Sequence, residues 1–233
     1  MKIKIIKGKI NKIVDLSKTA KEVEIKLSEP LDFSAGAFVN LFINIDGQKI
    51  RRAYSIASSP EEKDIIKIAM RLTPNGKMST LFWTKDMTGE ELEIMGPLGL
   101  NTVDKMNRKK VYLFGFGIGA GVTKGLVEYF KDMLDLEKLT IFTGSKFENE
   151  VLYKDYFENL THQNNKIEFN FTVSRPEENS NCTKGYIQDH IGKYDFNNSD
   201  IYICGQESAC NELVAKIKSL NPIDYDLFVE GFH

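Results

Sequence analysis

"LFGFGIGAGVTKG", residues 113–125, places four glycines at alternate positions between an apolar run and a stretch with helical spacing. A glycine-rich turn from a strand into a helix lets the backbone approach a pyrophosphate closely. Residues 115–120 also fit the G-x-G-x-x-A spacing of dinucleotide-binding turns. The alternative is a tight turn without a ligand. In either case the stretch favours a parallel α/β sheet.

The sequence around this turn alternates between strand and helix patterns. Short apolar runs predict strands at residues 110–115, 139–144, 167–173, 200–205 and 226–230. Apolar residues at helical spacing predict helices at residues 121–134, about 150–160 and 207–220. Such alternation is typical of a doubly wound α/β domain. The polar stretch at 175–185 is predicted to be a surface loop.

The first hundred residues follow a different pattern, in which short β-branched runs are separated by turn residues. Asp46-Gly47 is a strong hairpin signal. The runs predict six strands with almost no helix between them, at residues 3–6, 23–27, 38–45, 50–57, 65–70 and 92–95. This pattern indicates an antiparallel barrel or sandwich. The stretch "GPLGLNTVDKMNRK", 96–109, joins the two patterns.

Composition narrows the functional classes. The 233 residues are 42% hydrophobic and 27% charged with a net charge of −2, which gives no general attraction to nucleic acid. Three cysteines suit a reducing compartment and cannot form a four-cysteine metal or iron–sulfur site. We therefore expect no metal. The sequence shows neither an 18-residue apolar run nor a signal peptide, so we expect no membrane span and a cytoplasmic location.

The stretch "RRAYSIASSP", 51–60, carries a second candidate site. On a strand, Arg52 and Tyr54 point to one face, whereas Ala53 and Ser55 point to the other. Arginine is a phosphate-binding fork, and the neighbouring tyrosine supplies a flat aromatic surface. Arg51 points away from Arg52 and receives no role. The alternative is a half-exposed edge strand with incidental charges.

Three shorter patterns complete the candidates. "TPNGKMSTLFW", 73–83, resembles a phosphate site at a helix N-terminus, or else an ordinary capped helix. The strand predicted at 139–144 is followed by Ser145-Lys146 in place of the acidic residue typical of ribose binding, and this pair suits a 2′-phosphate. Cys204-Gly205 ends a buried strand where α/β sheets bind ligands, although a structural cysteine is the alternative.

The order of these motifs resembles the ferredoxin–NADP⁺ reductase superfamily, which includes cytochrome b5 reductases and oxygenase reductase components. The resemblance runs from about residue 5 to 233, and "RAYSIASSP" and "GPLG" match it almost letter for letter. It implies two domains: a six-stranded antiparallel Greek-key β-barrel that binds FAD, residues 1–102, and an α/β parallel-sheet domain that binds NAD(P), residues 103–233.

The resemblance also implies roles for the matching residues of the FAD domain. Within the Arg52-Ala53-Tyr54-Ser55 segment, Arg52 would bind the flavin phosphates, Tyr54 would stack on the isoalloxazine and Ser55 would lie near flavin N5. Four residues would hold the FAD pyrophosphate, namely Gly76, Met78, Ser79 and Thr80.

In the second domain the resemblance assigns the nucleotide contacts. The pyrophosphate would lie along Gly117, Gly119 and Ala120. The adenosine ribose would meet Ser145, Lys146, Ser174 and Arg175, and the nicotinamide would lie beside Cys204 and Gly205. The ending "FVEGFH" implies that Glu230 and Phe232 flank the flavin, or else it is a frayed tail. Ser55, Cys204 and Glu230 are thus the catalytic candidates, with Ser55 and Glu230 handling protons.

Departures from the superfamily pattern leave the choice of nucleotide open. Val122 and Gln206 stand where prolines are usual, and Lys146 stands where arginine is common. NADPH is slightly favoured over NADH.

The predicted activity is electron transfer from NAD(P)H through FAD to a one-electron acceptor: a ferredoxin, a flavodoxin or an oxygenase component. The alternatives are a flavin reductase that releases reduced flavin and a non-catalytic electron-transfer or regulatory subunit. Near the N-terminus, five lysines form either a basic stripe for an acidic partner or a solvated strand face: Lys2, Lys4, Lys7, Lys9 and Lys12.

Overall fold

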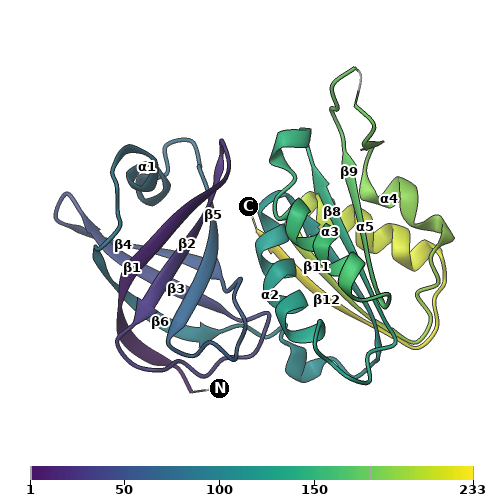
Figure 1. Cartoon of the computed structure of the whole chain (residues 1–233), viewed down its shortest axis with the longest axis horizontal. Helices are drawn as coiled ribbons and strands as arrows, with labels where there is room; N and C mark the ends of the chain where they lie inside the picture. The colour runs from purple at the N-terminus through teal and green to yellow at the C-terminus, as the bar shows by residue number, and fades with distance from the viewer. Residues whose placement is uncertain (1, 179, 233) are drawn as a thin grey trace. The chain divides into compact units, whose positions relative to one another are not determined.

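The computed structural model describes residues 2–178 and 180–232. It divides into two compact units, Met1–Val103 and Asp104–His233 (Figure 1).

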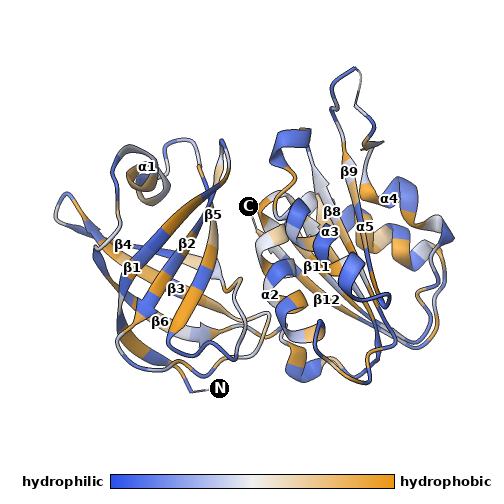
Figure 2. Cartoon of the chain, in the orientation of Figure 1, coloured by the Kyte–Doolittle hydropathy of each residue, from blue (hydrophilic) through white to orange (hydrophobic). Residues whose placement is uncertain are grey.

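The first unit is a six-stranded antiparallel sheet with the order β4-β3-β6-β1-β2-β5. Its strands are β1 (Lys4–Ser17), β2 (Ala20–Leu27), β3 (Phe38–Ile45), β4 (Gln48–Ser55), β5 (Ile65–Arg71) and β6 (Glu91–Leu98), and helix α1 (Lys77–Thr84) precedes β6. Buried and accessible residues alternate along the strands, as one-sided burial requires (Figure 2).

The sheet curves into a half-barrel because its two edge strands approach each other beyond the end of β4. Ile56 forms a bridge with Ile68, and the Ala57 N–H donates to the Lys67 carbonyl at 2.7 Å. The inward side chains are mainly aliphatic and form a continuous core. The predicted antiparallel domain is therefore confirmed, and its Greek-key connectivity stays a prediction.

The second unit is a parallel six-stranded sheet with the order β10-β9-β8-β7-β11-β12. Its strands are β7 (Lys110–Phe116), β8 (Lys138–Ser145), β9 (Ile167–Val173), β10 (Thr183–Lys184), β11 (Ser199–Gln206) and β12 (Tyr225–Phe232). Its α-helices are α2 (Ala120–Phe130), α3 (Lys154–Gln163), α4 (Ile187–His190) and α5 (Glu207–Ser219). Its short 3₁₀ turns are η1 (Val103–Lys105, at the joint between the units along the chain), η2 (Gly117–Gly119), η3 (Glu148–Glu150) and η4 (Ile191–Lys193).

Helices cover both faces of this sheet, so its central strands are apolar almost throughout (Figure 1). Helices α4 and α5 pack on the face that carries Phe114, Ile201 and Ile203. On the opposite face, Phe157 of α3 packs on Phe169 with ring centroids 5.0 Å apart. The predicted α/β domain is confirmed.

Three details differ from the sequence-based prediction. Strand β1 is much longer than the predicted 3–6, because buried Ile6, Gly8 and Ile10 alternate with outward lysines. Helix α2 ends at Phe130 instead of residue 134, because Leu134 continues the apolar spacing but is 96% exposed and joins no core. The loop predicted at 175–185 contains the short strand β10.

A buried carboxylate anchors the start of the second unit. Asp200 is fully buried, and its Oδ2 accepts hydrogen bonds from the backbone N–H groups of Asn107 at 2.6 Å and Arg108 at 2.7 Å. The Arg108 guanidinium also contacts Asp200 at 3.0 Å, Asp224 at 2.7 Å, and Asp226. This group of residues, called here the Asp200 clamp, fastens the segment before β7 to the beginning of β11 and β12.

Candidate cofactor site

Strand β4 presents the predicted flavin-binding residues on two faces. Arg52 lies opposite Leu41 and Tyr54 opposite Val39, so the two side chains share a face, while Arg51 lies on the other. Arg52 is exposed, and its Nη1 donates to the Arg51 carbonyl at 2.7 Å. Burial raises the pKa of Tyr54 well above its ordinary value despite the opposing charge of Arg52, so the phenol stays neutral. A cationic fork thus stands beside a neutral, half-buried ring.

The N-terminus of α1 is the second part of the candidate flavin site. Gly76 caps the helix without a side-chain hydrogen bond, and the first turn has no acidic residue. Amide groups at such an end favour an anion. Ser79 is buried, and its hydroxyl accepts from the Thr73 N–H and donates to the Gly76 carbonyl, both at 3.1 Å. The Ser79 side chain therefore shapes the loop, whereas Thr80 is exposed.

Position 76 of this loop has no room for a side chain. A Cβ on Gly76 would lie 2.7 Å from the Ser79 hydroxyl oxygen and 3.1 Å from the Thr73 carbonyl oxygen. Met78, also predicted to contact the pyrophosphate, is 2% exposed and belongs to the half-barrel core. Lys77 Nζ donates to Gln48 Oε1 at 2.8 Å and so ties the start of α1 to the start of β4. The residues present fit a phosphate-bearing aromatic cofactor.

In the second unit, the glycine turn after β7 packs against the end of β11. A Cβ on Gly119 would lie 2.3 Å from the Cys204 carbonyl oxygen, so only glycine fits there. Gly205 has a φ of +152° and approaches Phe116, where a Cβ would lie 2.5 Å from that residue's Cβ. Helix α2 begins at Ala120 without a side-chain cap or an acidic first turn. The glycine turn and the carboxyl end of β11 are therefore in close backbone contact.

The ends of β8 and β9 bring two predicted pairs of residues together. The Ser174 N–H donates to the Ser145 carbonyl at 3.0 Å, and the Arg175 N–H donates to the Lys146 carbonyl at 2.9 Å. Both cationic side chains are exposed. The Ser145 hydroxyl oxygen is buried and has no hydrogen-bond partner within the described residues. An orphaned hydroxyl at paired strand ends that also carry two exposed cations fits a phosphorylated ribose.

Cys204 and Glu230 are adjacent in the β11–β12 register. Burial, and next the nearby Glu230 carboxylate, raises the pKa of the Cys204 thiol well above its ordinary value. Cys204 is therefore a protonated, compact side chain suited to packing and not to nucleophilic attack. Phe232 of β12 pairs with Gln206 of β11, so the terminal segment through residue 232 is a strand and not a frayed tail.

Comparison with known proteins identifies both units. The chain matches the family model described as an oxidoreductase FAD-binding domain over residues 7–102 and the one described as an oxidoreductase NAD-binding domain over residues 115–214. The chain belongs to the ferredoxin–NADP⁺ reductase superfamily. The flavin half of its predicted site falls within the first matched domain, and the glycine turn and the Cys204 strand end fall within the second.

Curated relatives of this superfamily member are longer than the chain itself. It is 25% identical over 226 residues to the phenol hydroxylase P5 protein of Acinetobacter pittii (strain PHEA-2), covering 94% of this chain and 63% of that protein. It is 28% identical over 159 residues to ferredoxin–NADP reductase B of Sorangium cellulosum (strain So ce56), covering 68% and 65%. The chain thus spans about two thirds of the length of these relatives or slightly less.

Solved structures show the same fold. The Amycolatopsis cytochrome P450 reductase GcoB superposes with a TM-score of 0.84 at 20% identity, covering 97% of this chain and 70% of that one. A ferredoxin NADP⁺ reductase from Neisseria gonorrhoeae with bound FAD and NADP superposes with a TM-score of 0.81 at 17% identity, covering 97% and 99%.

Two residues that were not predicted as contacts, Lys184 and Tyr186, lie on the segment that runs beside the predicted nucleotide contacts at the end of β9. Lys184 of β10 pairs with Val173, and the Gly185 N–H donates to the Val173 carbonyl at 3.0 Å, so this segment runs beside Ser174. Tyr186 follows and is 60% exposed. In the sequence, Tyr186 is visible only as an aromatic residue just after a lysine and a glycine. Its position depends on the β9–β10 pairing, which was not predicted because the segment was predicted to be a loop.

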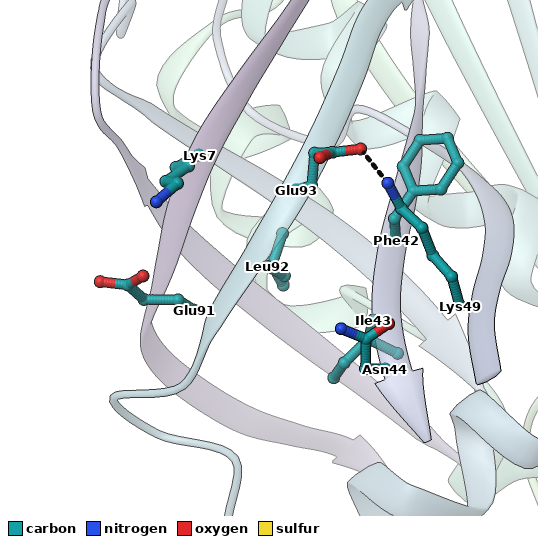
Figure 3. A pocket seen from close by; sticks show the side chains of 8 residues that line it. All are labelled: Lys7, Phe42, Ile43, Asn44, Lys49, Glu91, Leu92 and Glu93. Carbon is teal, nitrogen blue, oxygen red and sulfur yellow. Dashed lines mark hydrogen bonds and ion pairs between the residues drawn. The ribbon is translucent and has the colours of Figure 1, made fainter. Parts of the chain in front are cut away.

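The N-terminal lysines do not form one stripe. Lys4 points away from Lys7, and its Nζ donates to the Pro30 carbonyl at 3.1 Å. Lys7 lies opposite Glu93 in the register, and Lys9 lies opposite Glu91. Around this face, a shallow hollow of about 230 Å³ has mixed charge, with Lys49 Nζ 2.7 Å from Glu93 Oε1 (Figure 3). This arrangement supports the solvated-face alternative.

Residues 2–178 and 180–232 contain neither a membrane-spanning helix nor a metal-binding cluster. No helix there combines the length and apolarity needed to cross a membrane. No group of three or more His, Cys, Asp or Glu side chains there is placed to hold a metal. His162 is exposed and His190 Nε2 lies 3.0 Å from the Lys184 carbonyl oxygen, whereas His233 lies outside the described residues.

Proposed function

We propose that this chain binds FAD on its first unit and NAD(P)H on its second, and passes electrons to a one-electron redox protein. The observation that carries the proposal is the buried Ser145 hydroxyl oxygen at the end of β8, which has no hydrogen-bond partner among the described residues and whose residue is hydrogen-bonded through its backbone to the Ser174 segment. Buried polar groups normally have partners, and a bound nucleotide would supply one. The matched FAD- and NAD-binding domains give the same assignment to the two units.

When bound, FAD would accept a hydride from the nicotinamide and release electrons to the acceptor. Arg52 would bind the flavin phosphates together with the N-terminus of α1, and the neutral Tyr54 ring would support the isoalloxazine. Ser55 and Glu230 would hold protons near the reacting atoms. The protonated Cys204 would pack beside the nicotinamide, while Gly119 would admit the pyrophosphate.

NADPH would be the preferred nucleotide. Lys146 and Arg175 are exposed at adjacent strand ends, and Lys184 approaches the same edge through its pairing with Val173. Three exposed cations at the neighbouring ends of β8, β9 and β10 would favour a 2′-phosphate over a bare ribose diol. The exposed Tyr186 ring would provide a stacking surface for adenine.

The acceptor would be a ferredoxin, a flavodoxin or an oxygenase component. Relatives support this range by their names: one is the reductase component of a phenol 2-monooxygenase from a Pseudomonas species, 24% identical over 233 residues, and another is a ferredoxin–NADP reductase. Both are larger than this chain, which covers 65% of each.

The proposal is tested on the purified full chain. We expect yellow protein that retains about one FAD after dialysis, and flavin reduction in stopped flow that is faster with NADPH than with NADH. Protein that takes up no flavin would refute the proposal. Flavin that is reduced but lost on dialysis would instead identify a flavin reductase, and bound flavin that neither nucleotide reduces would identify a non-catalytic subunit.

A further inference from the structure

Tyr202 has no predicted role, yet its hydroxyl contacts a catalytic candidate directly. The residue lies on β11, two positions before Cys204, and is 1% exposed. Its hydroxyl donates to Glu230 Oε2 at 2.6 Å, across the β11–β12 pair. A short hydrogen bond between a buried phenol and a carboxylate is strong and directional.

Tyr202 acts as a donor over the whole working pH range. Burial, and then the Glu230 carboxylate, raises the pKa of Tyr202 well above its ordinary value. Cys204 is paired with Glu230 in the strand register. Tyr202 is paired with Phe228, two residues earlier in each strand. The Tyr202 ring therefore reaches along the strand direction and holds the carboxylate beside Cys204.

We propose that Tyr202 is the positioning residue that fixes the Glu230 carboxylate at the carboxyl end of β11. The inference rests on the proposed function, in which Glu230 handles a proton. Without the hydroxyl, the carboxylate loses a donor in a partly buried place and gains rotational freedom, so it is protonated more readily and is aimed less well.

Other ionisable groups act on Glu230 from the elements packed against it. Cys204 faces it from β11 and is protonated. From α5, Cys210 interacts with Glu230 and its thiol is also held protonated by burial, with a pKa of about 11. The Glu207 backbone and Cβ pack against Gly231, the residue that follows Glu230 in β12.

The test replaces Tyr202 with phenylalanine and uses Tyr112→Phe as the matched control. Tyr112 is also a buried strand tyrosine in this sheet, but its hydroxyl donates to the Asp195 carbonyl at 2.8 Å. In the full chain labelled with ¹³C-glutamate and assigned with Glu230→Gln, the titration midpoint of Glu230 should rise by about one pH unit in Tyr202→Phe and stay unchanged in Tyr112→Phe.

Kinetics supply the second readout. Flavin reduction by NAD(P)H should slow about tenfold in Tyr202→Phe, with the acid limb of its pH profile moved upward and nucleotide affinity unchanged. Adding Tyr202→Phe to Glu230→Gln should cause no further loss, because Tyr202 acts through Glu230.

The outcomes separate the two proposals. An unshifted Glu230 titration, or a Tyr202→Phe loss that adds fully to that of Glu230→Gln, overturns the positioning role while the proposed function stands. Wild-type rates in Glu230→Gln instead overturn the proton-handling role of Glu230, whatever the titration shows.

Discussion

Arg51 and Arg52 are chain neighbours on opposite faces of β4, and this makes them a matched pair for mutation. We expect Arg52→Ala to weaken FAD binding about 10- to 100-fold, because it removes a charge-assisted contact worth about 1.5–3 kcal/mol to the phosphates. Flavin fluorescence titration measures the affinity. Arg51→Ala should leave it unchanged, and equal losses in both variants would contradict the assignment of Arg52.

Gly119 offers a prediction about the nucleotide side. Alanine at this position would place a Cβ 2.3 Å from the Cys204 carbonyl oxygen. The contacted atom belongs to the backbone, so relieving the clash would require a shift of the main chain. We expect Gly119→Ala to lower the free energy of unfolding by about 1–3 kcal/mol and to weaken nucleotide binding. Thermal unfolding and isothermal titration measure the two effects.

The control for this variant is Gly192→Ala, because a Cβ at position 192 meets nothing within 4 Å. It should leave both stability and nucleotide binding near wild type. A Gly119→Ala protein with wild-type stability would show that the turn moves freely away from β11.

For single residues, the sequence predicted which face of a strand a side chain lies on better than it predicted contacts between residues far apart in the chain. A period of two was sufficient to put Arg52 and Tyr54 on one face. It could not reveal that the Ser145 hydroxyl oxygen is buried without a partner among the described residues, or that Tyr202 contacts Glu230, because both depend on how separate strands align. The role of Ser79 was also hidden, since its hydroxyl turns back into its own loop.

Among the elements, β9 carries a carboxylate whose charge depends on its neighbours. Burial disfavours the charge, but hydrogen bonds from Lys138, Tyr194 and Asn170 outweigh it and lower the pKa of Glu168 to about 2. A lowered folded-state pKa contributes stability above the unfolded value near 4.5, and this contribution is lost as pH falls from about 4.5 toward 2.

We therefore expect Glu168→Gln to be less stable than wild type at pH 7 and to lose less stability on acidification. About a third of this side chain is exposed, so solvent screening reduces the effect to about 1–2 kcal/mol. Urea unfolding between pH 3 and 7 measures it. The exposed Glu137→Gln is the control, and parallel pH curves for wild type and Glu168→Gln would contradict the prediction.

Element type was predictable, whereas element ends were less so. The antiparallel and α/β patterns were read correctly because burial on one face or on both leaves different periods in the sequence. The end of α2 was missed because apolar spacing continues to Leu134, and only the absence of a surface to pack against stops the helix. Strand β10 was missed because two residues carry no period at all.

For the whole molecule, the Asp200 clamp predicts which residues the second unit needs in order to fold by itself. Removing the donors of a fully buried carboxylate leaves its charge uncompensated, at a cost of about 3–5 kcal/mol. We expect a fragment starting at Asp104 to unfold cooperatively and a fragment starting at Lys110 to be less stable by that amount or unfolded. Circular dichroism in urea compares them.

If the shorter fragment cannot be purified, a variant of the full chain tests the same prediction. Asp200→Asn keeps the shape but removes the charge that Arg108 pairs with. It should destabilise the second unit less than loss of residues 104–109 does. Equal stability of the two fragments would show that the clamp is dispensable.

Whole-chain organisation was the level that the sequence predicted best. No single motif decided it, since each has an ordinary structural alternative. Their order along the chain was decisive. The R-x-Y-S motif lies in an antiparallel unit, and the glycine turn and the C-G strand end follow it in an α/β unit. What order could not supply is the acceptor, since recognition of a partner depends on the distribution of surface charge, and the lysines near the N-terminus proved to be interleaved with carboxylates.

The clamp also has a consequence for recombination between reductases. Asn107 and Arg108 precede β7 in the chain, yet their hydrogen bonds reach Asp200 of β11 and Asp226 of β12. A gene fusion that exchanges the flavin unit must therefore cross over before residue 107, so that donors and carboxylates are inherited from one parent. Crossovers three residues later would combine an arginine from one lineage with acids from another, and selection would remove them wherever the two had diverged.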